Sequence, residues 1–392
     1  MGQLRSIALA QLLASASLLS LSMTVPLIDL RRRVSLLQAD VLMAWTALLK
    51  EGPLIGGPTV EQFESTFAGY CGVSHCISVA NGTDALELGL RALDVQAGDE
   101  VITVGNAGGY TTAACQAIGA APVYIDVVPS TCQLSAELVE EAVTSKTRAI
   151  VVTHLYGLMN DVVDIRDRLL KLRRPDIAIL EDCAQAHGAR WGSAMAGSLG
   201  DAAAFSFYPT KNLGAFGDAG AILSSDARIA EKARQLRQYG WKEKYHTMTP
   251  GGRNSRMDPM QAIVLLVELE HLAKWNKQRQ EICSAYARHL PPGWSLVYRN
   301  SEDFVGHLAV AIAPDHEAAS AGRDELRRRG IGYDVHYPIL DSDQVGWRHC
   351  GRIVGSLEVS RNLTKRVTSL PCFAELTADE LDQVLDAIHA FS

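Results

Sequence analysis

The chain has 392 residues, of which 47% are hydrophobic and 21% are charged, and its formal net charge is -7. This composition is typical of a globular protein with enough apolar surface for two domains, or for one large enzyme with a smaller lobe. The acidic balance leaves no basic surplus to hold nucleic acid. The eight cysteines are scattered without a CxxC pair, so they predict neither a zinc site nor a disulfide scaffold. They favour the reducing cytoplasm, and no metal is expected.

The first 22 residues form a separate segment. Residues 1–22 begin with a basic residue, Arg5, and continue with an apolar stretch that contains small residues, which resembles a secretory signal. The alternative is that translation starts at Met23, because "MTVPLIDL" is a natural beginning for a cytosolic protein, and that the upstream residues are an extension. We favour this alternative. No later stretch is long and apolar enough to span a bilayer, so no membrane contact is expected.

From about residue 75, short apolar runs alternate with segments of helical period, the first of which is 84–93. The apolar runs are rich in Val, Ile and Ala and lack strict alternation, which is typical of a parallel sheet covered by helices on both faces. The predicted strands are residues 76–80, 100–104, 121–127, 149–156, 177–182, 202–208 and 220–225. The predicted fold class is therefore α/β, with right-handed crossovers.

Residues 260–290 read as one long helix that links a large domain to a smaller C-terminal lobe. The lobe is predicted to contain a strand at 307–313, a helix near 316–329 and a closing helix after 376–381 that Thr377 caps. We accordingly expect a large domain over residues 23–260 and a linking helix with a small domain over residues 261–392.

The stretch "SVANGTDALELGL" places a turn between a strand and a helix. Backbone N–H groups and the positive end of the helix dipole face such a turn, which makes an anion site. Gly82 allows close approach to the backbone, and Thr83 adds a hydroxyl. The alternative is a simple N-cap by Asn81 or Thr83, which is common.

The stretch "IAILEDCAQAHGA" places Glu181 and Asp182 at the end of a buried strand, where doubly wound sheets bind their ligands. A buried carboxylate needs a cationic or hydrogen-bonding partner. A protonated pyridine would serve Asp182 and would remain an electron sink, while Gln185 lies near enough to bind the same ligand. The alternative is an aspartate that caps a helix.

The stretch "FSFYPTKNLGAFGDAGAI" places Lys211 between an apolar strand and a glycine-rich loop. A desolvated lysine is an amine nucleophile that forms Schiff bases with aldehydes, whereas a structural lysine would extend to water. Ser206, on the strand, is a candidate phosphate ligand. The three stretches together provide an anion site, a carboxylate and an amine, which match the phosphate, pyridine and aldehyde of pyridoxal 5′-phosphate (PLP).

These stretches, with "GPLIGGPTVEQFESTFAGYCG" (52–72), "NSRMDPMQAIV" (254–264) and "HYP" (336–338), resemble the DegT/DnrJ/EryC1/StrS family of PLP-dependent sugar aminotransferases over roughly residues 25 to 385. The resemblance implies fold type I, the aspartate aminotransferase fold. That fold has a large domain with a mostly parallel sheet and a smaller C-terminal α+β domain. It also implies a homodimer with active sites at the interface.

The resemblance also implies a role for each matching residue. Lys211 would be the Schiff-base lysine and Asp182 the partner of the pyridinium. Gln185 would contact the PLP hydroxyl, and Gly82, Thr83 and Ser206 would hold the phosphate. Asn254 would reach the phosphate from the other subunit, and His336 and Tyr337 would approach the substrate.

Two features depart from the family pattern. Family members carry an aromatic residue that stacks on the PLP ring, but Gly108 stands at that place here, within "NAGGYTT". If Gly108 and Gly109 take conformations closed to other residues, the loop can turn Tyr110 over the ring. If the segment is helical, Tyr110 is an ordinary core or surface residue. In addition, the histidine that often follows "HYP" in the family is missing until His349.

The resulting functional hypothesis is an aminotransferase that moves an amino group, from glutamate, to a keto sugar nucleotide for amino-deoxysugar biosynthesis. The stretch "FSFYPTKNLG" resembles members that aminate C3 rather than C4. The alternatives are a cyclitol-ketone aminotransferase, a sugar dehydratase of the same family and an exported binding protein without enzymatic activity. Dehydratases replace the lysine with histidine, so Lys211 argues against that alternative.

Overall fold

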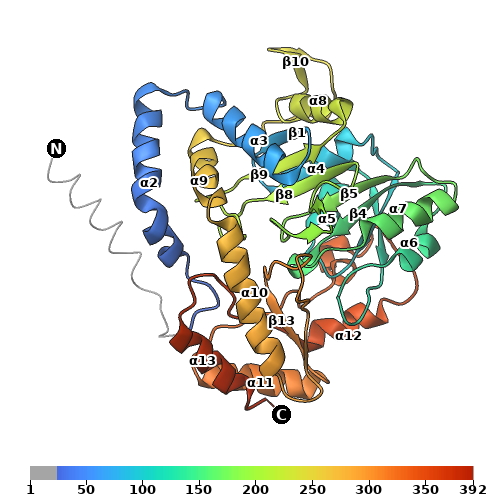
Figure 1. Ribbon diagram of the computed structural model, residues 1–392. Coiled ribbons are helices and arrows are strands. Elements are labelled where there is room, and N and C mark those ends of the chain that lie inside the picture. Colours follow the sequence, from blue (N-terminus) through green and yellow to red (C-terminus); the bar gives the residue numbers. More distant parts are fainter. Residues whose placement is uncertain (1–23, 392) are drawn as a thin grey trace.

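The protein is described here from a computed structural model over residues 24–391, so the signal-like segment 1–22 lies outside the described residues. An eight-stranded sheet forms the centre of the larger part of the molecule (Figure 1). In spatial order its strands are β1 (His75–Val79), β9 (Gly220–Ser224), β8 (Ala202–Ser206), β5 (Ala178–Asp182), β4 (Thr147–Thr153), β2 (Glu100–Val104), β3 (Ala121–Ile125) and β14 (Arg352–Ile353). Each of the seven strands predicted in this region is present within a few residues of its expected bounds.

The sheet is mostly parallel, as expected for this fold class. Only β9 runs against its neighbours, since it pairs antiparallel with both β8 and β1. The reason is local: β8 and β9 are joined by the loop that contains Lys211, with no crossover helix, and a direct connection of this kind gives antiparallel strands. The carboxyl ends of β1, β5 and β8 consequently lie at one edge of the sheet.

Helices cover both faces of this sheet, and the strand residues alternate between the two. Ala202 and Ala204 of β8 pack in the core beneath α4, α5 and α8, whereas Ala203 and Phe205 pack on the opposite side against α3 and α9. Burial on both faces explains why these strands lack a polar alternation. The helices are α2 (Leu30–Glu51), α3 (Pro58–Cys71), α4 (Gly82–Ala92), α5 (Tyr110–Ile118), α6 (Ala136–Ala142), α7 (Val162–Lys171), α8 (Ala227–Leu236), α9 (Pro259–Leu269), α10 (Leu272–His289), α11 (His316–Arg328), α12 (Glu358–Arg366) and α13 (Ala378–Ile388).

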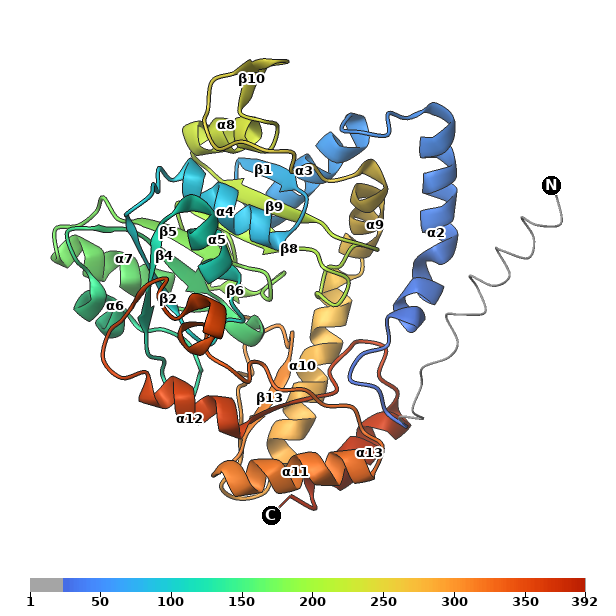
Figure 2. The same ribbon diagram turned by 180° about the vertical axis from the view of Figure 1, so that it is seen from behind.

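The expected long helix at 260–290 is two helices, which corrects the prediction. α9 ends at Leu269 and α10 begins at Leu272, with Glu270 and His271 between them. Apolar residues continue across the break, so the sequence pattern did not reveal it. α10 then runs from the large sheet to the small one, which lies with α11 and α13 at one end of the molecule (Figures 1 and 2).

The small sheet has three antiparallel strands in the order β12 (Ser295–Leu296), β13 (Ala309–Ile312) and β15 (Val367–Leu370). The predicted strand at 307–313 and the predicted helix near 316–329 are therefore confirmed as β13 and α11. Thr377 caps α13 in a reciprocal capping box with Glu380, as its sequence position predicts. Two short hairpins complete the strands: β6 (Arg190–Trp191) with β7 (Ala194–Met195), and β10 (Trp241–Glu243) with β11 (His246–Thr247).

The C-terminal part of the chain also returns to the large sheet. β14 pairs in parallel with β3, Arg352 opposite Val123 and Ile353 opposite Tyr124. At the other end of the chain, Val25 forms a bridge with Ile331. The domain boundary at 260–261 stays a prediction. Within residues 24–391 we find no helix whose length and apolar character would let it cross a membrane.

Candidate active site

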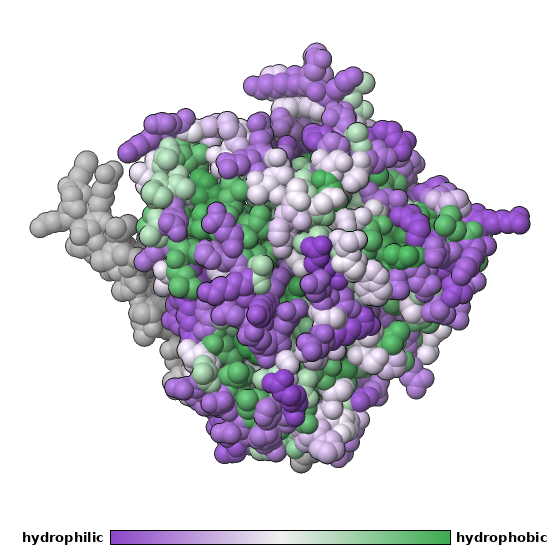
Figure 3. Space-filling view, in the orientation of Figure 1, coloured by the Kyte–Doolittle hydropathy of each residue, from purple (hydrophilic) through white to green (hydrophobic). Residues whose placement is uncertain are grey.

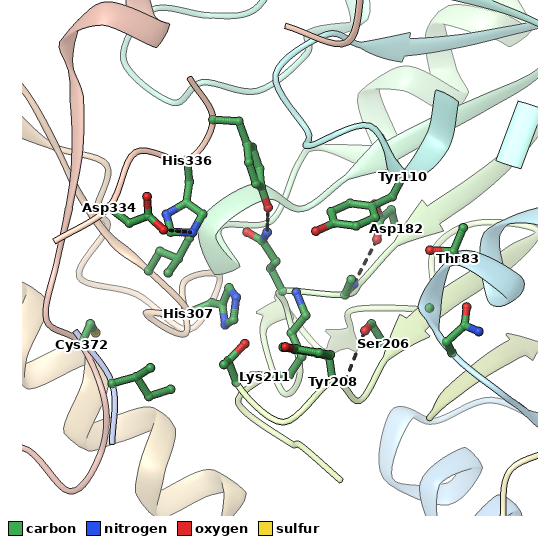
Figure 4. A pocket seen from close by; sticks show the side chains of 18 of the residues that line it. Thr83, Tyr110, Asp182, Ser206, Tyr208, Lys211, His307, Asp334, His336 and Cys372 are labelled. Carbon is green, nitrogen blue, oxygen red and sulfur yellow. Dashed lines mark hydrogen bonds and ion pairs between the residues drawn. The ribbon is translucent and has the colours of Figure 1, made fainter. Parts of the chain in front are cut away.

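A cavity of about 730 Å³ opens at the carboxyl ends of β1, β5 and β8 (Figure 4). All predicted site residues except Asn254 line it. These are Gly82, Thr83, Tyr110, Asp182, Gln185, Ser206, Lys211, His336 and Tyr337. Residues more than 250 positions apart in the sequence thus meet at the edge where open α/β sheets bind their ligands.

The N-terminus of α4 forms one wall of the cavity. Asn81 caps the helix by accepting a hydrogen bond from the Asp84 amide (2.8 Å). Gly82 is required by close packing, because a Cβ at this position would lie 2.5 Å from the Cβ of Ser206. The start of an 11-residue helix, the hydroxyl of Thr83 and the hydroxyl of Ser206 therefore converge on one small space, which is suited to an anion.

Asp182 is the last residue of β5 and is followed by a turn, so the alternative of an aspartate that caps a helix is wrong. Its carboxylate accepts hydrogen bonds from the amide of Ala184 (3.1 Å) and the hydroxyl of Thr153 (3.4 Å). Burial raises the pKa of Asp182, although these hydrogen bonds and the charge of Lys211 oppose the shift. Among the described residues, no cationic side chain forms an ion pair with it, so a cationic ligand would stabilise its ionised form.

Glu181 points away from the cavity, as alternation along a strand requires. Its carboxylate accepts hydrogen bonds from the amides of Gly197, Leu199 and Gly200. The ring of His154 lies 2.9 Å from it. Burial opposes ionisation of this group, but these contacts together lower the pKa of Glu181. The two adjacent acids thus have different roles, and only Asp182 faces the ligand space.

Lys211 lies in the turn after β8, where its amide donates to the carbonyl of Tyr208 (2.8 Å). Its half-buried side chain lines the cavity on the side of Asp182 (Figure 4). Burial lowers the pKa of the Lys211 ammonium to about 8, while the charge of Asp182 opposes the shift. Roughly a quarter of such amines are unprotonated near pH 7.5, against roughly one in a thousand for an ordinary lysine.

Two buried charged residues hold the turn that carries Lys211. Arg33, from α2, donates a hydrogen bond from Nη1 to the carbonyl of Lys211 (2.9 Å). Glu268, from α9, accepts one from the amide of Gly214 (2.9 Å). The two side chains are 3.7 Å apart, and they are 2% and 0% exposed. Glu375 also approaches Arg33, with 3.5 Å between Oε1 and Nε.

The loop before α5 explains the missing aromatic residue at position 108. Gly108 has φ +83, and a Cβ there would lie 2.8 Å from the ring of Tyr337. No side chain fits at this position, because Tyr337 occupies the space. Gly109 also has a positive φ of +86, and α5 begins at the next residue. Tyr110 consequently extends into the cavity near Asp182 and Thr83 (Figure 4).

The "HYP" loop (336–338) forms another wall of the cavity. Gln185 accepts a hydrogen bond from the amide of Tyr156 (2.6 Å) and donates one to the hydroxyl of Tyr337 (3.2 Å). The hydroxyl of Tyr156 donates to the carbonyl of His336, and the His336 ring contacts the hydroxyl of Ser369 (2.8 Å). These contacts fix the loop against β5 and β15.

Comparison with known proteins identifies the chain. A model of the DegT/DnrJ/EryC1/StrS aminotransferase family matches residues 36–389. The chain belongs to this family. It is 39% identical over 362 residues to dTDP-3-amino-3,4,6-trideoxy-alpha-D-glucose transaminase of Micromonospora megalomicea, covering 90% of this chain and 94% of the relative. It is 35% identical over 365 residues to UDP-N-acetyl-3-dehydro-alpha-D-glucosamine 3-aminotransferase of Acidithiobacillus ferrooxidans, covering 93% and 97%.

The fold is also that of known family structures. The structure of Streptomyces venezuelae DesV in complex with a ketimine intermediate superposes with a TM-score of 0.88 at 37% identity, covering 93% of this chain and 97% of DesV. The protein is therefore an aminotransferase of fold type I, and its cofactor is PLP. The reading as a non-enzymatic binding protein is wrong.

The residues of this DegT/DnrJ/EryC1/StrS aminotransferase fit PLP on structural grounds. Lys211 provides an amine with a lowered pKa. Asp182 provides a buried carboxylate, and a protonated pyridine would be its cationic partner. Gly82, Thr83 and Ser206 all line the cavity at the start of α4, so the amides of this helix end and the two hydroxyls are open to a phosphate.

Asn254 does not line the cavity of its own chain. It is exposed and forms a backbone bridge with Gln238. An exposed side chain at this position can contact another subunit, and the role of Asn254 in a neighbouring active site stays a prediction.

Several cavity residues were missed by the sequence analysis. They are Leu27, Ile28, Tyr208, Thr210, Asp218, His307, Asp334 and Cys372, among others. His307 had a usable signal, because it is a polar residue at the start of an apolar strand. Leu27 and Ile28 had none, since only the folded chain brings the N-terminal segment to the C-terminal lobe.

Proposed function

We propose that this enzyme transfers the amino group of glutamate to a keto sugar nucleotide and places it at C3 of the sugar. The observation that carries the proposal is the meeting of Lys211 and Asp182 in one cavity of about 730 Å³. The names of the relatives support the substrate class, since both describe nucleotide sugars with the amine at C3. Their nucleotides differ, dTDP in one and UDP in the other, so the proposal specifies the class and not the base.

When bound, PLP supplies an aldehyde for the amino group and a ring that accepts electrons. The chain's residues act around it. Asp182 would offer its negative charge to the pyridine, and Gly82, Thr83 and Ser206 would bind the phosphate. Lys211 would hold the cofactor through Nζ. When this amine is free, it would take the proton from the donor Cα, because its lowered pKa leaves part of it unprotonated.

The same residues carry the remaining site proposals. Gln185 can donate its second amide hydrogen to the cofactor hydroxyl, because Tyr337 takes only one. Tyr110 offers its ring as the aromatic face in place of the missing side chain at Gly108. His336 and Tyr337 stand on the substrate side of the cavity. Lys211 stands where the family's dehydratases have histidine, which disfavours dehydration, and a cyclitol ketone is the second candidate acceptor.

We also propose a homodimer with shared active sites, in the cytoplasm. The outer face of α2 exposes large apolar side chains: Leu36 (63%), Leu42 (57%), Met43 (70%) and Leu49 (65%). Figure 3 shows apolar residues gathered over this part of the surface. Patches of this kind usually mark an interface, and a second copy would cover this one. All eight cysteines are free thiols, in agreement with a reducing compartment.

Turnover on a panel of keto sugar nucleotides with glutamate tests the function. We expect a new amine at C3, identified by NMR of the product, and no product with Lys211→Ala as the control. Nitrogen at C4 would overturn the regiochemistry. Turnover of cyclitol ketones alone would overturn the nucleotide-sugar assignment.

Mixing two inactive variants tests the shared site. One hybrid site would be intact when Lys211→Ala and Asn254→Ala subunits exchange, so some activity should return. If mass spectrometry demonstrates exchange and no activity returns, Asn254 does not act across the interface.

A further inference from the structure

His307 is a cavity residue whose role the proposed mechanism leaves open. It precedes β13, is 6% exposed, and lies between Lys211 and His336 in the cavity (Figure 4). A histidine donates or accepts hydrogen bonds at each nitrogen depending on its tautomer. The contacts of its Nδ1 determine which tautomer is present here.

A chain of buried amides fixes the proton on Nδ1. Nδ2 of Asn276 donates to the carbonyl of His187 (2.8 Å), so Oδ1 of Asn276 faces Asn212. Nδ2 of Asn212 donates to that oxygen (2.8 Å) and to the carbonyl of Val305 (3.0 Å). Since backbone carbonyls only accept, both amide orientations are determined. Oδ1 of Asn212 therefore accepts from Nδ1 of His307 (2.9 Å), and Nδ1 carries the hydrogen.

The other ring nitrogen, Nε2, is consequently an acceptor. Within residues 24–391 no side chain or amide donates to it. Burial lowers the pKa of His307 well below its usual value, and the positive charges of Lys211 and Arg279 act in the same direction, as do His187 and His336. The ring is therefore neutral across the physiological pH range.

We propose that Nε2 of His307 accepts a hydrogen bond from a hydroxyl of the keto sugar and so selects the orientation of the sugar at Lys211. This inference rests on the proposed function. The ligand group must be a donor, because Nε2 only accepts. A neutral hydroxyl fits better than the ammonium of the amino donor, since Lys211 and Arg279 already make this side of the cavity positive.

Replacing His307 distinguishes the sugar hydroxyl from the ammonium of the amino donor, because the two groups enter the site in different half-reactions. His307→Phe keeps the ring size but has no acceptor, and His307→Gln keeps an amide oxygen near the position of Nε2. Stopped-flow absorbance of the cofactor follows each half-reaction separately. For His307→Phe we expect kcat/KM for the keto sugar nucleotide to fall about 10- to 100-fold, as for a buried hydroxyl left without a partner, and His307→Gln to recover most of it. A fall in kcat/KM that is confined to the half-reaction with glutamate would show that Nε2 accepts from the ammonium of the amino donor. That result would overturn the proposal.

Asn212→Asp tests the tautomer without removing the histidine. An aspartate beside Nδ1 stabilises the imidazolium, in which Nε2 donates. We expect the variant to lose the keto-sugar half-reaction at low pH and to regain it as pH rises through the new pKa of His307. ¹⁵N NMR of the enzyme without cofactor should show hydrogen on Nδ1 alone in the wild type. Hydrogen on Nε2 in the wild type would overturn the proposal even if the enzyme turns over keto sugars.

A wild type that bears hydrogen on Nδ1 but turns over no keto sugar nucleotide would instead defeat the proposed function. Calorimetric titration of the cofactor-free enzyme with a sugar nucleotide gives a further readout. Affinity should fall in His307→Phe and be retained in His307→Gln, and equal affinity in wild type and His307→Phe would refute the contact.

Discussion

Replacing Arg33 with methionine tests the ion pair that holds the Lys211 turn. Methionine keeps much of the volume of the arginine stem but removes the charge that lies 3.7 Å from Glu268. Glu268 is fully buried, and its pKa of about 7 means that it is ionised in the wild type at pH 8. Without Arg33 the unpaired carboxylate takes up a proton, which at pH 8 costs at most about 1.4 kcal/mol. With the lost hydrogen bond to Lys211, we expect Arg33→Met to lower the free energy of unfolding by about 2–3 kcal/mol at pH 8.

The stability that Arg33→Met loses should depend on pH, because Glu268 changes its protonation state. Burial raises the pKa of Glu268 from 4.5 to about 7, while the charge of Arg33 opposes the shift. The ionised carboxylate therefore destabilises the fold above pH 7, and this penalty disappears as pH falls from about 7 toward 4.5. Without Arg33 the pKa rises further, so at pH 6 the variant contains a neutral Glu268. The decrease in the free energy of unfolding should then be only about 1–2 kcal/mol at pH 6, which corresponds to the missing hydrogen bond to Lys211.

Urea unfolding at pH 8 and pH 6 measures both effects at one fixed protein concentration, since any dimer links stability to concentration. Glu268→Gln is the matched control, because glutamine still accepts from the amide of Gly214. The double variant should be more stable at pH 8 than Arg33→Met alone, since no buried charge is left unpaired. Equal losses at both pH values, or additive losses in the double variant, would show that Arg33 and Glu268 do not act as a pair.

Three further predictions concern single positions. Lys211→Ala should fold with an unchanged circular dichroism spectrum but show no transamination without added amine, and full turnover would contradict its role. Tyr110→Ala should release PLP more readily and shift its absorbance band, whereas Tyr110→Phe should do neither; identical retention and spectra in both would remove Tyr110 from the cofactor face. Thr377→Ala should cost about 1 kcal/mol through loss of the α13 cap, measured by urea unfolding, and no change would show that the capping box is not stabilising.

Features encoded by neighbouring residues were predictable from the sequence. The strands of the large sheet are continuous apolar runs, so their positions could be read directly. The Lys211 turn and the start of α4 are also local, since each depends on a strand, a turn and a few adjacent polar residues. Asp182 required one inference more, namely that the carboxyl ends of parallel strands meet at one edge.

Features that depend on tertiary contacts were not predictable. The break between α9 and α10 leaves the apolar pattern intact. The exclusion of a side chain at Gly108 depends on Tyr337, which is 229 residues away in the numbering. The tautomer of His307 depends on Asn212 and Asn276, and on two carbonyls that only the folded chain brings near. Arg33 is the last of three consecutive arginines, a pattern that is typical of a solvated helix face, but its side chain is buried beneath α2.

The pairing of β14 with β3 limits how this enzyme can be divided. A fragment ending at residue 260 would lack Arg352 and Ile353, and β3 would become the edge of the large sheet with its backbone groups unpaired. Exposed edges of this kind invite pairing between molecules. A truncated or circularly permuted version should therefore retain the segment that carries β14. New chain ends are better placed in the β10–β11 hairpin than between the two sheets.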